Sequence, residues 1–124
     1  MIFAQITGWG EYTPPLVMTN DDIAKIVDTS DEWIQTRSGI RQRHYSHVST
    51  GEMAWLSAER ALACAGVAAE DIDLIILGST TVEEICPNTA SIIKNKLGAD
   101  KAAVFDLNSA CTSWLFALSA ASDM

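Results

Sequence analysis

The chain has 124 residues, of which 48% are hydrophobic, and its mean hydropathy is slightly positive. These values are typical of a globular domain with its own core and argue against a disordered tail. The formal net charge of −8, from 8 basic and 16 acidic residues, argues against a role on nucleic acid or anionic lipid.

Neither a membrane span nor a secretory signal is predicted. No stretch approaches the roughly 18 apolar residues that would cross a bilayer, and the N-terminus lacks the basic flank and cleavage site of a signal peptide. The three cysteines, Cys64, Cys86 and Cys111, are widely spaced and odd in number, which fits free thiols in a reducing compartment. We therefore expect a cytoplasmic protein.

The chain begins with a predicted strand, because residues 2–8 have the length and apolar content of a buried one. The glycines and prolines that follow, Gly8, Gly10, Pro14 and Pro15, are incompatible with a regular element. Gly8 and Gly10 do not make a dinucleotide-binding motif, which needs a third glycine and a helix directly after it.

Two short helices are predicted next. The first lies in residues 19–27, with Asn20 as its N-cap. The second begins with a capping box from Thr29 to Glu32 and ends at Gly39.

Trp33 and Arg37 stand four residues apart in the second helix and are expected on one face. A ring beside a guanidinium can hold a nucleotide base and a phosphate, and it can equally stack on its neighbour as a surface pair. Arg37 also belongs to a basic cluster with Arg41, Arg43 and His44. This cluster is either the site of an anionic ligand or a solvated basic edge.

Strands and helices alternate in the rest of the chain. Residues 40–46 are expected to form a strand, and a longer helix then runs from a capping box between Ser49 and Glu52 to Gly66. Four alanines lie on one face of this helix: Ala54, Ala58, Ala61 and Ala65. Such a stripe of small residues predicts close packing on a sheet.

Two apolar runs, residues 73–79 and 102–107, have the length of strands covered on both faces. Residues 87–98 between them are predicted to form a helix that ends at Gly98. This alternation predicts an α/β fold with a mainly parallel sheet.

Cys111 follows the last predicted strand and precedes a helix-like segment, residues 112–124. A helix N-terminus favours an anion, and ligands of open α/β sheets collect at the carboxyl ends of strands, so a cysteine here can act as a nucleophile. The alternative is a buried, inert cysteine. Cys64 is expected to pack within its helix, and Cys86 to lie in a loop near a pocket.

No metal site and no bound cofactor are expected. His44 and His47 make no zinc-binding spacing with the cysteines, and helix capping explains the positions of the acidic residues. The sequence contains neither a Walker A nor a HExxH motif.

Three segments together resemble β-ketoacyl-[acyl-carrier-protein] synthase III, a condensing enzyme of the thiolase superfamily. They are VDTSDEWIQTRSGIRQRH at 27–44, DLIILGSTT at 73–81 and DLNSACTSW at 106–114. The resemblance implies a thiolase-like αβαβα fold. Residues 1–124 would then supply most of its first half, as a partial N-terminal half-domain.

The resemblance implies roles for four residues. Cys111 matches the nucleophile that accepts an acyl group from acyl-CoA, before a malonyl thioester, carried by acyl carrier protein, decarboxylates and attacks it. Trp33 and Arg37 match the positions that hold the adenine and phosphates of coenzyme A, and Thr29 is adjacent to the same site.

Members of this family carry a histidine and an asparagine in their second half that assist decarboxylation, and neither His44 nor His47 matches that histidine. The implied partners are a second copy in a homodimer or a polypeptide that carries the second half. The alternative is a condensation-incompetent subunit that contributes a coenzyme A pocket or a dimer surface. Cys86 and Trp114 differ from common residues of the acyl pocket, so an acetyl group is not specified.

Overall fold

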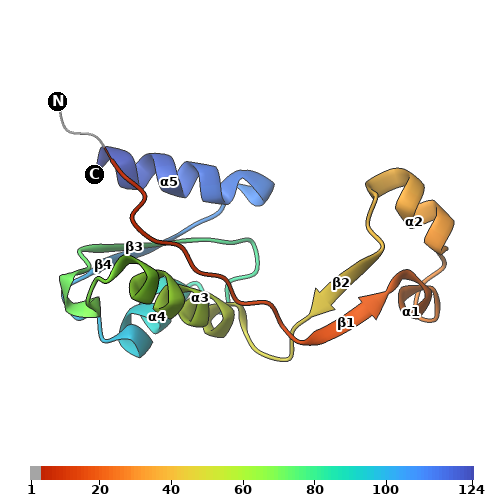
Figure 1. Ribbon diagram of the computed structural model, residues 1–124, viewed down its shortest axis with the longest axis horizontal. Coiled ribbons are helices and arrows are strands. Elements are labelled where there is room, and N and C mark those ends of the chain that lie inside the picture. Colours follow the sequence, from red (N-terminus) through yellow and green to blue (C-terminus); the bar gives the residue numbers. More distant parts are fainter. Residues whose placement is uncertain (1–3) are drawn as a thin grey trace. The chain divides into compact units, whose positions relative to one another are not determined.

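The computed structural model describes residues 4–124, which divide into two compact units. Unit 1 comprises Met1–Tyr12 and Val48–Met124, and unit 2 comprises Thr13–His47. Figure 1 shows the elements of both units. No helix within residues 4–124 combines the length and the apolar character that crossing a membrane requires.

Unit 1 is built around two parallel strands, β3 (Leu74–Gly78) and β4 (Ala103–Leu107), with Leu74 paired with Ala103. Helix α4 (Thr89–Leu97) lies between them in the sequence, as parallel strands require a long crossover connection. The predicted α/β class with a parallel sheet is therefore confirmed.

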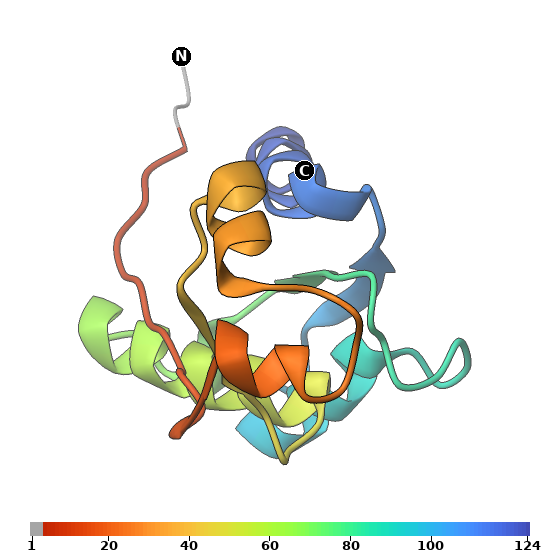
Figure 2. The same ribbon diagram turned by 90° about the vertical axis from the view of Figure 1, so that its right-hand side faces the viewer.

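Helices cover both faces of this sheet (Figure 1, Figure 2). Helices α3 (Thr50–Ala65) and α4 lie on one face, and α5 (Ser113–Asp123) lies on the other. Helix α4 packs on both strands and on α3, whereas α5 packs mainly on β3. The buried apolar side chains are alanines apart from one isoleucine and belong mostly to α4 and its flanks: Ala90, Ile93, Ala99, Ala102 and Ala117.

The helices of unit 1 begin and end close to where the sequence predicts. The Ser49 hydroxyl accepts the N–H of Glu52 at 3.2 Å, and Gly66 ends α3 in the left-handed conformation. Gly98 ends α4 in the same way. The Glu52 carboxylate pairs with Lys96 of α4, so it ties two helices together.

The N-terminal segment differs from the prediction. Residues 2 and 3 of the predicted strand lie outside the described residues, and its remainder up to Gly8 forms no strand. This segment packs on α3 instead of pairing with a strand. A Cβ at Gly8 would come within 2.6 Å of the Ala61 carbonyl oxygen, and one at Gly10 within 2.3 Å of another backbone oxygen of α3. The alanine stripe thus makes a close approach to these glycines.

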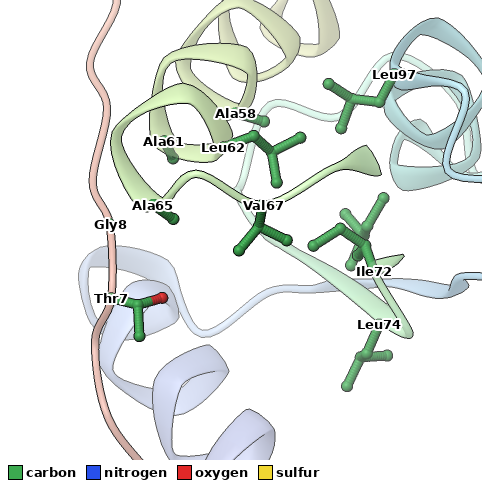
Figure 3. A pocket seen from close by; sticks show the side chains of 11 residues that line it. Thr7, Gly8, Ala58, Ala61, Leu62, Ala65, Val67, Ile72, Leu74 and Leu97 are labelled. Atoms are coloured by element: carbon green, nitrogen blue, oxygen red, sulfur yellow. The ribbon is translucent and has the colours of Figure 1, made fainter. Parts of the chain in front are cut away.

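An apolar hollow of about 270 Å³ lies between this segment, α3 and the sheet (Figure 3). Ala58, Ala61 and Ala65 line it from α3, and Leu74 lines it from β3. Its lining contains one side-chain hydroxyl, from Thr7, and no charged group. We attribute this space to the small side chains of α3.

Unit 2 is an antiparallel ribbon with two helices. Strands β1 (Leu16–Thr19) and β2 (Gln42–Tyr45) pair with each other, and the chain between them forms α1 (Asn20–Ala24) and α2 (Asp31–Ser38). Strand β2 confirms the prediction for residues 40–46. Strand β1 was not predicted, because it has only four residues and directly follows two prolines.

Both helices of unit 2 begin one residue away from the predicted cap. Thr19, not Asn20, caps α1: its hydroxyl accepts the Asp22 N–H at 3.2 Å, and the Asp22 carboxylate accepts the Thr19 N–H at 3.0 Å. Ser30, not Thr29, caps α2 by accepting the Trp33 N–H at 3.1 Å. The Asn20 and Thr29 side chains are therefore not helix caps and are free to make other contacts within unit 2.

Candidate active site

Cys111 lies in the turn between β4 and α5, where the sequence predicts it. Strand β4 ends at Leu107, Ala110–Thr112 form one turn of 3₁₀-helix, and α5 begins at Ser113. The Cys111 side chain is exposed. An exposed thiol at the carboxyl end of a parallel strand has the open approach that a nucleophile needs.

The residue before Cys111 has a strained backbone. Ala110 has φ of 49°, and within residues 4–124 it is the one non-glycine residue with a positive φ. This conformation costs an L-residue roughly 1–2 kcal/mol. Asn108 Oδ1 accepts the Ala110 N–H at 3.1 Å, and the Thr112 hydroxyl donates to the Ser109 carbonyl at 2.7 Å. Strain that neighbouring contacts maintain is common at functional sites.

An apolar hollow of about 420 Å³ lies between β3 and α5. Ile76 and Gly78 line it from β3, and Trp114 and Leu118 line it from α5. Trp114 follows Cys111 by three residues in the sequence. The lining suits a hydrocarbon chain better than a charged group.

The other two cysteines are also exposed. The prediction that Cys64 packs within its helix is wrong, because the packed face of α3 carries Ala58, Ala61 and Ala65. Cys86 lies in the loop between β3 and α4, as predicted. Exposure alone therefore does not distinguish the three thiols. What distinguishes Cys111 is its position in the strained turn between β4 and α5.

Helix α2 of unit 2 carries the predicted coenzyme A residues. The Arg37 guanidinium carbon lies 6.0 Å from the centroid of the Trp33 ring, which confirms that the two side chains share a face. They stack on each other, which is one of the two arrangements that the sequence left open. Trp33 is 58% exposed, so its ring also has a free surface for a planar group.

Thr29 lies beside Trp33. With Asp28, Ser30 and Trp33 it lines a hollow of about 340 Å³. Its hydroxyl oxygen is buried and has no hydrogen-bond partner. Buried polar groups normally have partners, so this hydroxyl is a candidate contact for a ligand.

A polar network holds α2 against the ribbon of unit 2. The Asn20 side chain is 1% exposed and donates to Asp31 Oδ1 at 2.7 Å and to the Ile40 carbonyl at 2.8 Å. Its oxygen accepts Arg43 Nη2 at 2.6 Å. Hydrogen bonds from Gln35 and Asn20 lower the pKa of Asp31. The sequence predicts Asn20 as a helix cap and not as the centre of this network; the hydroxyl of the neighbouring Thr19 serves as the cap instead.

The basic cluster is divided between two roles. Arg43 belongs to the network and also donates to the Met18 carbonyl at 3.2 Å, and His44 Nδ1 lies 2.6 Å from the Pro14 carbonyl oxygen. Arg37 and Arg41 are exposed. The structure thus assembles Thr29, Trp33 and Arg37 within unit 2, while Cys111 belongs to unit 1.

No protein-family model matches the chain. The similar proteins and the similar solved structures nevertheless carry the same kind of name. The chain is 50% identical to β-ketoacyl-[acyl-carrier-protein] synthase III 2 of Vibrio cholerae over 119 residues, which are 96% of this chain and 33% of that protein. The solved structure of 3-oxoacyl-[acyl-carrier-protein] synthase III from Aquifex aeolicus matches with a TM-score of 0.91 and 41% identity, over 96% of this chain and 39% of the other.

A third match is the priming β-ketosynthase from the R1128 polyketide biosynthetic pathway, with a TM-score of 0.92 and 36% identity over 98% of this chain and 37% of that one. The chain thus spans about a third of the length of its relatives. Sequence and fold make it a relative of the β-ketoacyl-[acyl-carrier-protein] synthase III proteins that matches the N-terminal part of their thiolase-like α/β fold.

Proposed function

We propose that this chain contributes the acyl-accepting part of a 3-oxoacyl-[acyl-carrier-protein] synthase III-type acyltransferase. Cys111 accepts the acyl group of acyl-CoA, while Thr29, Trp33 and Arg37 bind the coenzyme A portion. The observation that carries this proposal is the exposed Cys111 in a strained turn after β4, in a chain 50% identical to a protein named as such a synthase.

The first step forms a thioester on Cys111. The thiolate attacks the carbonyl carbon of acyl-CoA, and the bond between that carbon and the coenzyme A sulfur breaks. Coenzyme A leaves as a thiolate and takes up a proton, which balances the one that Cys111 lost. Covalent catalysis of this kind divides one difficult acyl transfer into two easier steps.

The second step is a condensation. A malonyl thioester on acyl carrier protein loses carbon dioxide, and the resulting carbanion attacks the carbonyl carbon of acyl-Cys111. The β-ketoacyl product then leaves, and the Cys111 thiolate is regenerated. We assign help with decarboxylation to a histidine and an asparagine outside residues 1–124, supplied by a second-half segment or partner in a cytoplasmic, homodimeric enzyme.

Different surfaces serve the two ends of acyl-CoA in this proposal. In unit 2, the exposed face of the Trp33 ring takes the adenine, Arg37 takes a phosphate, and the unpartnered Thr29 hydroxyl adds a polar contact. In unit 1, the apolar hollow lined by Trp114 takes the hydrocarbon part of the acyl group.

The test is acylation by acetyl-CoA of the protein expressed from its complete coding sequence. We expect intact mass to show one added acetyl group, and peptide mapping to place it on Cys111. Cys111→Ser should abolish the adduct, whereas Cys64→Ser, which removes another exposed thiol, should retain it. An adduct confined to Cys64 or Cys86 contradicts the assignment, and binding of coenzyme A without any adduct supports the condensation-incompetent subunit instead.

A further inference from the structure

Ser113 is a buried polar residue at the start of α5, two residues after Cys111, and is 4% exposed. Its hydroxyl oxygen accepts the Ser109 N–H at 2.9 Å, and its hydroxyl group donates to the Ala110 carbonyl at 2.8 Å. This one side chain therefore connects the helix that follows Cys111 with the two residues before it.

This use of the hydroxyl is not helix capping. The N-cap of α5 is Thr112, and its side chain makes no capping hydrogen bond. Ser113 lies inside the helix, and its side chain bonds backwards to the turn. Alanine would favour the helix at least as well as serine at this position. The Ser113 hydroxyl therefore serves the turn and not the helix.

The turn that Ser113 bridges is the strained one. Ala110 is held at φ of 49°, and its carbonyl is the group to which Ser113 donates. Asn108 fixes the N–H of the same residue. Both polar groups of Ala110, the residue before Cys111, thus have side-chain partners, and its carbonyl also accepts the Ser113 backbone N–H.

Ser113 is itself fixed from the side of the sheet. A Cβ at Gly78, the last residue of β3, would lie 3.0 Å from the Ser113 carbonyl carbon and 3.2 Å from its Cβ. Glycine at this position lets the first turn of α5 rest directly on the end of the strand. The Ser113 hydroxyl therefore holds the Cys111 turn against a rigid element.

We propose that Ser113 is a positioning residue for Cys111: its hydroxyl maintains the strained Ala110 turn and so places the sulfur for attack on the thioester. This inference rests on the proposed function, since it assumes that Cys111 is the nucleophile. Ser113 touches neither substrate nor reacting atoms in this role, so it acts on the rate of acylation and not on the binding of coenzyme A.

The experiment compares Ser113→Ala with the wild type, both expressed from the complete coding sequence. Single-turnover acylation by acetyl-CoA is followed over a range of concentrations, which separates the maximal rate from the half-saturating concentration. We expect Ser113→Ala to lower the maximal rate roughly tenfold, as the loss of these hydrogen bonds suggests, with the half-saturating concentration unchanged. Alkylation of Cys111 by iodoacetamide, measured relative to Cys64 in the same sample, should fall in parallel.

Ser119→Ala is the matched control, because it makes the same change at an exposed position of the same helix. It should leave both quantities unchanged. Equal maximal rates in Ser113→Ala and wild type overturn the proposal, as does a raised half-saturating concentration at an unchanged maximal rate, or an equal loss in Ser119→Ala. A wild-type protein that is not acylated on Cys111 overturns the proposed function itself, so the two failures are distinguishable.

Discussion

The Arg37 guanidinium has two competing partners in the proposed site. Its stacking on the exposed Trp33 ring, with 6.0 Å between guanidinium carbon and ring centroid, is worth about 0.5–1 kcal/mol. A hydrogen bond between a charged donor and a phosphate is worth about 1.5–3 kcal/mol. Since the second value is larger, a phosphate is expected to draw Arg37 away from the ring and leave the ring face for the adenine.

Arg37→Ala should therefore weaken coenzyme A binding by about 1.5–3 kcal/mol, or roughly 10- to 150-fold in Kd. Isothermal titration calorimetry with coenzyme A measures this change directly. Lys101→Ala removes one positive charge from an exposed position in unit 1 and controls for net charge. Identical Kd values for wild type and Arg37→Ala would remove Arg37 from the site.

The sequence locates Cys111 better than it describes the turn around it. The order of strand, small residues and apolar helix is a local pattern, and it places the cysteine at the end of a strand. The φ of Ala110 and the hydrogen bonds of Ser113 depend on the packing of α5 on β3. A local sequence pattern carries no information about this packing. The same holds for Asn20, whose partners Asp31 and Arg43 lie 11 and 23 residues away.

Among the elements, helix ends were more predictable than helix starts. Gly39, Gly66 and Gly98 each end a helix in the left-handed conformation, because glycine alone adopts it without a steric penalty. The starts of α1 and α2 lie in runs of adjacent cap-forming residues, such as Thr19 with Asn20, where several residues have the required side-chain oxygen. Tertiary contacts then decide which residue serves as the cap.

Asn20→Ala is expected to destabilise unit 2. The change removes a side chain that is 1% exposed and leaves Asp31 and Arg43 without one hydrogen bond each. Hydrogen exchange should show faster exchange throughout β1, α2 and β2, while the amides of β3 and β4 keep their protection. Asn95→Ala, at an exposed position of α4, is the control. Uniform protection of unit 2 in Asn20→Ala would contradict a structural role for the network.

The same network predicts a dependence on pH. Hydrogen bonds from Gln35 and Asn20 lower the pKa of Asp31 in the folded chain, so its ionised form is favoured by folding. This stabilisation is present above the ordinary pKa of an aspartate, near 4, and is lost as the pH falls through the lower value of the folded state.

Asp31→Asn should accordingly cost stability at neutral pH, and the difference from wild type should shrink as the solution is acidified below about pH 4. Chemical denaturation at a series of pH values measures the two free energies of unfolding. The difference between the two free energies of unfolding at neutral pH is the reference with which the differences at lower pH are compared. A difference that stays constant into the acid range would show that the Asp31 charge does not contribute.

For the molecule as a whole, α5 presents an unusual surface. Trp114, Leu115 and Phe116 are each more than half exposed, although α5 also packs on β3. A helix that is apolar on all sides normally has neighbours on all sides. The net charge of −8 makes copies of the chain repel one another, but salt screens this repulsion. Apolar contact between the exposed side chains of α5 can then favour association.

Residues 1–124 expressed alone are therefore expected to self-associate. Sedimentation velocity should show species larger than a monomer, and no condensation product should form from acetyl-CoA and malonyl thioester. Phe116→Glu should shift the distribution toward monomer by charging the exposed face of α5. Ile85→Glu makes the same kind of change in the loop after β3, where the side chain is 93% exposed, and should have little effect. A cooperatively unfolding wild-type monomer would contradict this expectation.

The alternation of strands and helices predicted the architecture of unit 1, because each parallel strand is covered on both faces and reads as a short apolar run. The separation of residues 13–47 into a unit of their own was not predicted. No run of glycine, serine or proline marks its end near His47, and its two buried residues, Pro14 and Asn20, make no apolar cluster that hydropathy could reveal.

The packing of Gly8 and Gly10 on α3 has a consequence for the order of events during synthesis. Unit 2 draws all its internal contacts from Thr13–His47, so its ribbon can close as soon as that stretch has left the ribosome. The segment with Gly8 and Gly10 is made before unit 2, but its partner Ala61 is made 53 residues after Gly8. Gly8 and Gly10 are thus made before unit 2 but can pack on α3 only after unit 2 has been made, so the ribbon can form before this packing does.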